Sequence, residues 1–96
     1  MNFSFHPEAE IELNKAIDYY ENIYSDLGLD FANEVYVAIQ RSVSLPEAWA
    51  VIDGNIRRSL VNRFPFGILY SKEGDKILVI AVMHLNRLPN YWKDRT

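Results

Sequence analysis

Apolar residues recur at helical spacing through the first half of the chain. Phe3 and Phe5 alternate with polar neighbours and predict a short first strand. Pro7 suits the first turn of a helix, where its missing N–H is harmless, and Gly28 is a natural C-terminal stop. Between them runs one helical stripe, made of Ala9, Leu13, Ala16, Ile17, Tyr20, Tyr24 and Leu27. The pattern therefore predicts a strand followed by an amphipathic helix that ends near Gly28.

A second helix is predicted after a very short link. Asp30 is a suitable N-cap, and Pro46 ends the helical pattern. Its buried side should consist of Phe31, Val35, Ala38, Ile39 and Ser42. Because the link around Gly28 is so short, the two helices should form an antiparallel hairpin.

The second half of the chain has the periodicity of strands. Residues 47–55 are predicted to form a loop with Trp49 folded back as an anchor, and strands are expected at about 56–61, 66–71 and 76–83. Residues 72–75 are a hairpin turn signal. The last strand is apolar on both faces, with Ile77, Val79 and Ala81 alternating with Leu78, Ile80 and Val82. Such a strand should be central and covered on both sides.

These elements predict one α+β domain over residues 1–96, in the order β-α-α-β-β-β. The helical hairpin should pack on one face of a small, mainly antiparallel sheet. The expected core includes Leu13, Ile17, Tyr20, Val35, Ile39, Ile80 and Val82. Glu12 belongs to the acidic residues expected on exposed helix faces, so its replacement by alanine should change stability by less than about 0.5 kcal/mol.

Composition narrows the class of protein. The chain has 96 residues, 49% of them hydrophobic, and no cysteine, which fits one globular domain without disulfides or thiolate metal sites. It has no apolar run long enough to cross a bilayer and no signal-peptide pattern, so we expect a cytoplasmic protein. The net charge of −3 hides an asymmetry: residues 1–54 hold ten Asp/Glu and two Lys/Arg (−8), and residues 55–96 hold three and eight (+5). Such a split is a hint of an anionic or acidic partner.

Motifs in a fixed order carry a family resemblance. They are Ala9 to Tyr20 in the first helix, Leu27-Gly28 with Phe31, Pro46, Arg57-Arg58, Arg63-Phe64-Pro65-Phe66 with Tyr70, and the closing His84-x-x-Arg87-x-Pro89-x-Tyr91-Trp92-x-x-Arg95. Together they resemble the RelE/ParE superfamily of type II toxin–antitoxin toxins, also called plasmid-stabilisation proteins. The resemblance implies a small bacterial growth-inhibiting toxin. It also implies a cognate antitoxin that holds the toxin inactive by laying an extended or helical segment along its sheet and helix grooves.

The resemblance leaves the target open. RelE-like toxins cleave messenger RNA in the ribosomal A site, as metal-independent endoribonucleases, whereas ParE-like toxins inhibit DNA gyrase and are not enzymes. RelE-like nucleases are strongly basic, but the first helix here is acidic and an acidic helix repels a polyanion. The ParE-like reading is therefore slightly favoured. A degenerate toxin that only binds its antitoxin is a third reading, and no reading requires a cofactor or metal.

Arginines and a histidine in the second half are the candidate site residues. If the chain is a nuclease, His84 suits proton transfer, Tyr91 could orient or stack a base, and phosphates could be clamped by Arg58, Arg63 and Arg87. As a toxin of either kind, its partner-binding residues would be Arg57, Arg58, Arg63, Arg87, Tyr91, Trp92 and Arg95. Structural alternatives stand beside these roles. His84 could be a hydrogen-bonded structural group, Tyr91 and Trp92 could cap the open side of the sheet, and Arg57 and Arg58 could pair with helix carboxylates such as Glu34.

Overall fold

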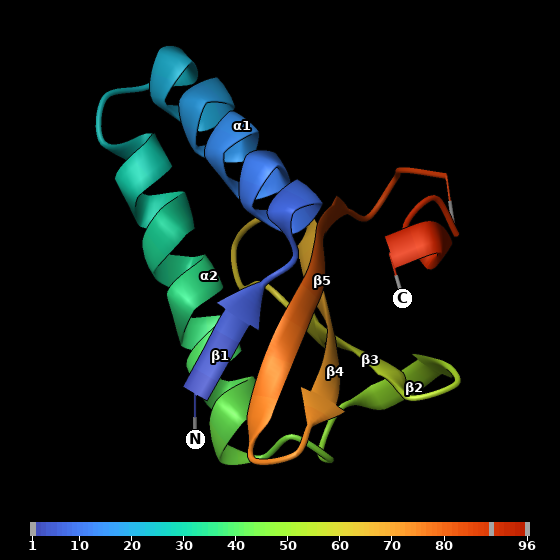
Figure 1. Cartoon of the computed structure of the whole chain (residues 1–96). Coiled ribbons are helices and arrows are strands. Elements are labelled where there is room, and N and C mark those ends of the chain that lie inside the picture. Colours follow the sequence, from blue (N-terminus) through green and yellow to red (C-terminus); the bar gives the residue numbers. More distant parts are fainter. Residues whose placement is uncertain (1, 89, 96) are drawn as a thin grey trace.

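The predicted helical hairpin packs on one face of a five-stranded sheet (Figure 1). A computed structural model describes residues 2–88 and 90–95, so Pro89 of the closing motif lies outside the described residues. The elements are β1 (Asn2–Phe5), α1 (Pro7–Ile23), α2 (Leu27–Ser44), β2 (Ala50–Asp53), β3 (Ile56–Leu60), β4 (Phe66–Glu73), β5 (Lys76–His84) and a 3₁₀ helix (Lys93–Arg95). The α+β class is confirmed, with one strand more than expected.

The sheet has the strand order β1-β5-β4-β3-β2. Strand β1 pairs with β5 in parallel and every other pair is antiparallel, so the mainly antiparallel sheet is confirmed. The prediction of a loop over 47–55 is wrong for Ala50–Asp53, which form the edge strand β2. All four of its residues are exposed. An edge strand without a buried face lacks the apolar alternation by which strands are recognised.

The link between the helices lies further towards the N-terminus than predicted. Helix α1 ends at Ile23, and Asp26, with φ of 70°, reverses the chain before α2 starts. Gly28 is therefore not a helix stop but lies in the first turn of α2, where the Glu21 carboxylate accepts hydrogen bonds from the backbone N–H groups of Asp26 and Gly28 at 3.0 Å each. A Cβ on Gly28 would stand 2.6 Å from the Ile17 carbonyl oxygen. This glycine lets the two helices approach each other closely.

A β-bulge changes the faces of β5 halfway along the strand. Leu69 pairs with Ala81 and Tyr70 with Val79, so Ile80 is the extra residue. The predicted regular alternation is therefore wrong beyond Ile80. Val82 joins the helix side of the sheet, whereas Ala81 faces the opposite side. Both faces of β5 are still covered, as expected for an interior strand.

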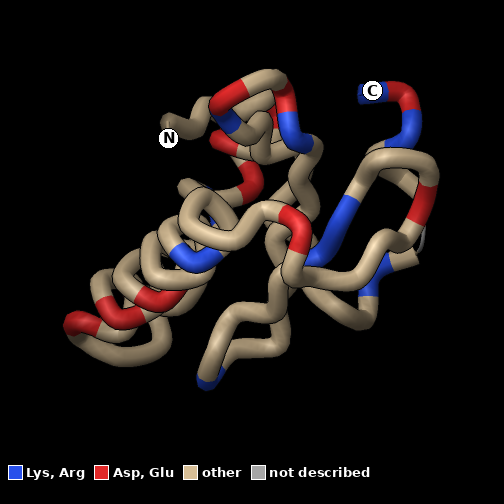
Figure 2. The backbone as a smooth tube through the Cα atoms, turned by 90° about the horizontal axis from the view of Figure 1, so that it is seen from below, with Lys and Arg blue, Asp and Glu red and all other residues tan. Residues whose placement is uncertain are grey.

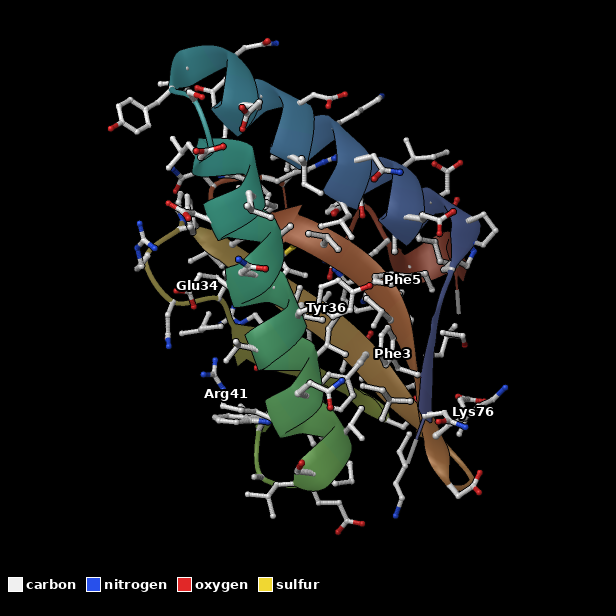
Figure 3. The ribbon with its side chains drawn as sticks, turned by 90° about the vertical axis from the view of Figure 1, so that its left-hand side faces the viewer. Phe3, Phe5, Glu34, Tyr36, Arg41 and Lys76 are labelled. Carbon is white, nitrogen blue, oxygen red and sulfur yellow. The ribbon has the colours of Figure 1, made fainter. Side chains whose placement is uncertain are left out.

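Two apolar clusters lie on the two faces of the sheet. The larger lies under the helices and contains Leu13, Val35, Ile39 and Val82 as predicted, with Ile17, Tyr20 and Trp49 packed against it as partly buried residues. Phe3 and Phe5 of β1 also join it, and Figure 3 shows them beside α2, where the Phe3 ring lies 6.0 Å from that of Tyr36. The smaller cluster lies on the other face and consists of Ile56, Leu69, Ile80, Ala81, Met83 and Trp92.

Candidate functional site

Glu12 of α1 is the centre of the best-connected polar cluster in the described structure. Its carboxylate accepts hydrogen bonds from Arg95 Nη1 at 2.9 Å and Nη2 at 3.1 Å, and from the backbone N–H of Val82 at 3.1 Å. Arg87 Nη1 lies 3.5 Å away. Only 11% of the Glu12 side chain is exposed. The expectation of an exposed Glu12 is wrong, because this carboxylate faces β5 and residues 90–95, the C-terminal segment, instead of solvent.

Tyr91 is held between two arginines of this cluster. The Arg87 guanidinium carbon lies 3.7 Å from the Tyr91 ring centre, and that of Arg95 lies 5.0 Å from it. Burial, followed by the negative charge of Glu12, raises the pKa of the Tyr91 phenol above its ordinary value. Burial alone would lower the pKa of Arg95, but hydrogen bonding and the charge of Glu12 outweigh it and raise that pKa. Tyr91 is thus a neutral spacer between paired cations.

Trp92 lies on the sheet face opposite the helices. It is 3% exposed and packs in the smaller cluster, where Tyr91 adjoins it as a partly buried residue. The C-terminal segment thus covers part of that face. Its 3₁₀ helix is drawn in red in Figure 1. The structure therefore gives Trp92 the capping role that was the alternative to partner binding.

His84 lines an open groove of about 530 Å³ between α1 and the ends of β4 and β5, which we call the α1–β5 groove. Its lining residues are Glu12, Lys15, Ala16, Tyr19, Tyr20, Ile23, Pro65, Phe66, Val82, His84 and Arg87. His84 Nδ1 accepts a hydrogen bond from the backbone N–H of Asn86 at 3.0 Å, which leaves Nε2 as the N–H donor of the neutral ring. The Phe66 ring stands edge-on to His84 at 5.2 Å. The groove is therefore largely apolar, with Lys15, His84 and Arg87 as the side-chain N–H donors among its lining residues.

The three other candidate arginines, Arg57, Arg58 and Arg63, lie apart from this groove. Arg57 donates to the carbonyls of Glu47 at 3.1 Å and Trp49 at 2.7 Å, which ties down the segment before β2. Glu34 is paired not with Arg57 or Arg58 but with Arg63, at 3.8 Å, and Arg63 also lies 3.6 Å from Asp30. With 57% of the Arg63 side chain exposed, these ion pairs contribute little to stability.

Arg58 lies on the sheet face opposite the helices. The aliphatic part of its side chain covers Gly67, since a Cβ there would stand 3.2 Å from Arg58 Cγ and Cδ. Arg58 is thus an exposed residue on the sheet face opposite the α1–β5 groove.

The geometry brings together some candidates and separates others. His84 and Arg87 share the α1–β5 groove, and Arg87, Tyr91 and Arg95 meet at Glu12, whereas Arg57, Arg58, Arg63 and Trp92 lie elsewhere. Within residues 2–88 and 90–95, no group of three His, Asp or Glu side chains could hold a metal ion. Nor is any helix described here long and apolar enough to span a bilayer.

Sequence reasoning missed Glu12, Lys15 and Tyr19 as residues of this region. A signal for Glu12 was present, because it stands three residues after Ala9 and four before Ala16 and so borders the buried stripe of α1. Lys15 and Tyr19 stand on the neighbouring face of the same helix, and only the position of the strand ends makes that face a groove wall.

Comparison with known proteins yields a structural likeness without a sequence match. No known family profile matches the chain, and no curated protein matches it in sequence. The fold is similar to that of a chain of the chromosomal ParDE TA (toxin–antitoxin) system from P. aeruginosa, with a TM-score of 0.77 and 14% sequence identity. The likeness covers 90% of this chain and 97% of that chain. At this identity it shows that the two chains share the fold of two helices on a mixed sheet.

Proposed function

We propose that this chain is the toxin of a type II toxin–antitoxin module, held inactive by a cognate antitoxin. The observation that carries the proposal is the likeness to the ParDE chain over nearly the full length of both chains. The ordered motifs from the first helix to Arg95 support it independently, since they resemble the same superfamily. A cytoplasmic site of action follows from either target of such a toxin.

Inhibition of DNA gyrase, without hydrolysis, is the mode of action that we favour. RNA cleavage needs a base, an acid and cations around one phosphate. Arg58 lies on the sheet face opposite the helices and Arg63 pairs with Asp30 and Glu34 of α2, so Arg87 is the one candidate arginine that shares the groove with His84. The carboxylates lie largely along the helical hairpin and the cations mainly on the strands and the C-terminal segment (Figure 2). An acidic hairpin is a poor surface for ribosomal RNA.

Ribosome-dependent mRNA cleavage is the second candidate function. The observation in its favour is that His84 and Arg87 line one groove, where Nδ1 of His84 accepts from the Asn86 N–H and Nε2 is left for a ligand. A degenerate toxin, which binds the antitoxin and inhibits nothing, is the third.

Inducible expression in a bacterial host tests the toxin proposal. We expect growth to stop on induction, plasmid supercoiling to be lost and reporter mRNA to stay intact. Co-expression of the cognate antitoxin should restore growth. His84→Ala is compared with Lys76→Ala, an exposed control at the far end of β5. Intact supercoiling together with mRNA cuts that His84→Ala slows by about 10²–10⁴-fold would instead establish the nuclease. Normal growth without the antitoxin would leave only the degenerate reading.

A further inference from the structure

Helix α2 has an exposed stripe without charge, opposite the side that packs on the sheet. Six exposed residues form it, and we call them the outer face of α2: Leu29, Asn33, Tyr36, Val37, Gln40 and Ser44. The large apolar side chains among them are 58% exposed at Leu29, 50% at Tyr36 and 46% at Val37. Because the solvent side of a surface helix normally carries charged residues, an uncharged stripe along nearly the whole helix is typical of a contact with another helix.

The spacing of the outer face is the same in both directions along the helix. Its residues are four, three, one, three and four positions apart, so the midpoint lies between Tyr36 and Val37. A second copy of α2, laid antiparallel about a two-fold axis through this midpoint, brings Asn33 level with the partner's Gln40. These two amide side chains can hydrogen-bond to each other. The outer face of α2 is therefore complementary to itself in the antiparallel direction.

A groove beside the C-terminal half of α2 gives a second copy a place to insert a side chain. It has a volume of about 470 Å³, and its lining residues are Tyr36, Val37, Gln40, Arg41, Ser44, Leu45 and Trp49. In the antiparallel arrangement the partner's Leu29 comes level with Ser44 and so lies over this groove. The insertion removes an exposed leucine from water, and the two-fold axis repeats it at the other end of the contact.

Charges beside the outer face favour the same direction. Glu34 and Arg41 lie on one side of α2 (Figure 3). Glu34 and Asp30 share a single cation, Arg63, at 3.8 and 3.6 Å. Arg41 reaches only the Leu60 carbonyl, at 3.4 Å, and no carboxylate of the described residues lies within ion-pair distance of it. In the antiparallel pair, Arg41 of each copy comes level with the stretch between Asp30 and Glu34 of the other, whereas a parallel pair would place like charges together.

From this arrangement we propose that the protein binds a second copy of itself through the outer face of α2, as an antiparallel pair of helices about a two-fold axis. Tyr36 and Val37 form the apolar centre of the contact, and Glu34 and Arg41 lie at its rim. An apolar centre with a charged rim is the usual build of a homodimer interface. The proposal does not depend on the proposed function. It also leaves the α1–β5 groove free, because no residue of α2 lines that groove.

Analytical ultracentrifugation over a range of protein concentrations measures the dimer. Val37→Glu places a carboxylate at the centre of the contact, next to its symmetry-related copy. Val51→Glu is the matched control, because Val51 is 51% exposed on the edge strand β2. We expect Val37→Glu to weaken dimerisation by about tenfold or more and Val51→Glu to change it by less than about twofold. Thermal melts establish that both variants are folded.

Cysteine cross-linking tests the register, since the chain has no cysteine of its own. Asn33→Cys and Gln40→Cys are prepared separately, and each is oxidised mildly alone and after mixing. In the antiparallel pair, residue 33 is level with residue 40 of the partner, whereas like residues are seven positions apart along the helix axis. Seven positions correspond to about 10 Å, which a disulfide does not span. We therefore expect a disulfide-linked dimer from the mixture and little from either variant alone.

Several results would overturn the proposal. One is a wild-type protein that stays monomeric at every concentration, and another is a dimer that Val51→Glu disrupts and Val37→Glu does not. Cross-linking of each cysteine variant with itself, and not in the mixture, would show a parallel contact instead. A monomeric protein whose affinity for the antitoxin falls with Val37→Glu would assign the outer face of α2 to the antitoxin. The cysteine variants keep the test decisive if Val37→Glu fails to fold.

Discussion

Glu12→Ala is the change that tests most directly how the C-terminal segment is held. It removes the acceptor of two Arg95 hydrogen bonds and of the Val82 N–H. Arg95 would keep its bond to the Ile80 carbonyl at 3.1 Å but would lose its counter-charge. The Arg87 contact adds little, since that side chain is half exposed.

The expected loss of unfolding free energy follows from the burial of Glu12 and Arg95. Removing one partner of a buried ion pair costs about 3–5 kcal/mol, because the other charge stays buried and unpaired. Since 10% of the Arg95 side chain and 11% of the Glu12 side chain remain exposed, water compensates in part. We therefore expect Glu12→Ala to lower the free energy of unfolding by about 3 kcal/mol, a large share of the 5–15 kcal/mol typical of a domain. Glu12→Gln should cost about 1–2 kcal/mol, because its one carbonyl oxygen can still accept from Arg95 Nη1 and the Val82 N–H, but the charge and the bond to Nη2 are lost.

Urea denaturation supplies the measurement, with the midpoint and slope fitted for each variant. Glu10→Ala is the matched control, because Glu10 is exposed on the same helix, and it should stay within about 0.5 kcal/mol of wild type. The double variant Glu12→Leu/Arg95→Met should lose much less than the sum of the single changes, since it leaves no orphaned charge. If Glu12→Ala is as mild as Glu10→Ala, the cluster is solvated in solution and the argument from burial is refuted.

Three further changes test the fold and its pH dependence. Ile80→Ala should lower the unfolding free energy by about 2–5 kcal/mol, since Ile80 is 2% exposed, and a loss below about 1 kcal/mol in urea denaturation would contradict its place in the smaller cluster. Gly28→Ala should lower the melting temperature, although alanine normally favours a helix by about 1 kcal/mol, because its Cβ would meet the Ile17 carbonyl; an unchanged or raised melting temperature would show that the helices can separate at no cost. The raised pKa of Tyr91 keeps its phenol protonated in the folded state at a pH where the unfolded chain ionises, so this contribution is complete below about pH 10 and is lost as the pH rises through the folded-state pKa. Tyr91→Phe should therefore show a gentler alkaline loss of unfolding free energy than wild type, and equal slopes would mean that the phenol is free to ionise.

The layered architecture could be predicted from the sequence because it depends on strong periodic signals. Long apolar stripes identified α1 and α2, and the apolar character of residues 77–82 identified an interior strand. The features that escaped prediction depend on single contacts. Strand β2 has no buried face, and the bulge at Ile80 arises from pairing with β4. The start of α2 is set by the Glu21 carboxylate, which accepts from the first N–H groups of that helix.

The candidate site likewise has features that the sequence indicated and features that it did not. The residue types of the closing motif indicated a functional region, and His84, Arg87, Tyr91 and Arg95 do come within reach of one carboxylate or groove. The sequence did not show which of these side chains are free to bind a partner. That depends on Glu12, a residue from the other half of the chain. A glutamate in an acidic helix start gives no sign of its partner 83 positions away.

The 83 positions between Glu12 and Arg95 affect the order in which parts of the protein can fold. Strand β1 cannot pair until β5 has been synthesised, since Asn2 pairs with Lys76. Likewise, Glu12 cannot bind Arg95 until that residue has been synthesised. Contacts between such distant parts of a chain make folding slow and leave early segments exposed during synthesis. The helical hairpin can form early, but its buried Glu12 carboxylate has no counter-ion until the chain has been made as far as Arg87 and Arg95. Nascent chains that stall before Arg95 would therefore hold the Glu12 carboxylate without the partner that makes its shortest hydrogen bonds.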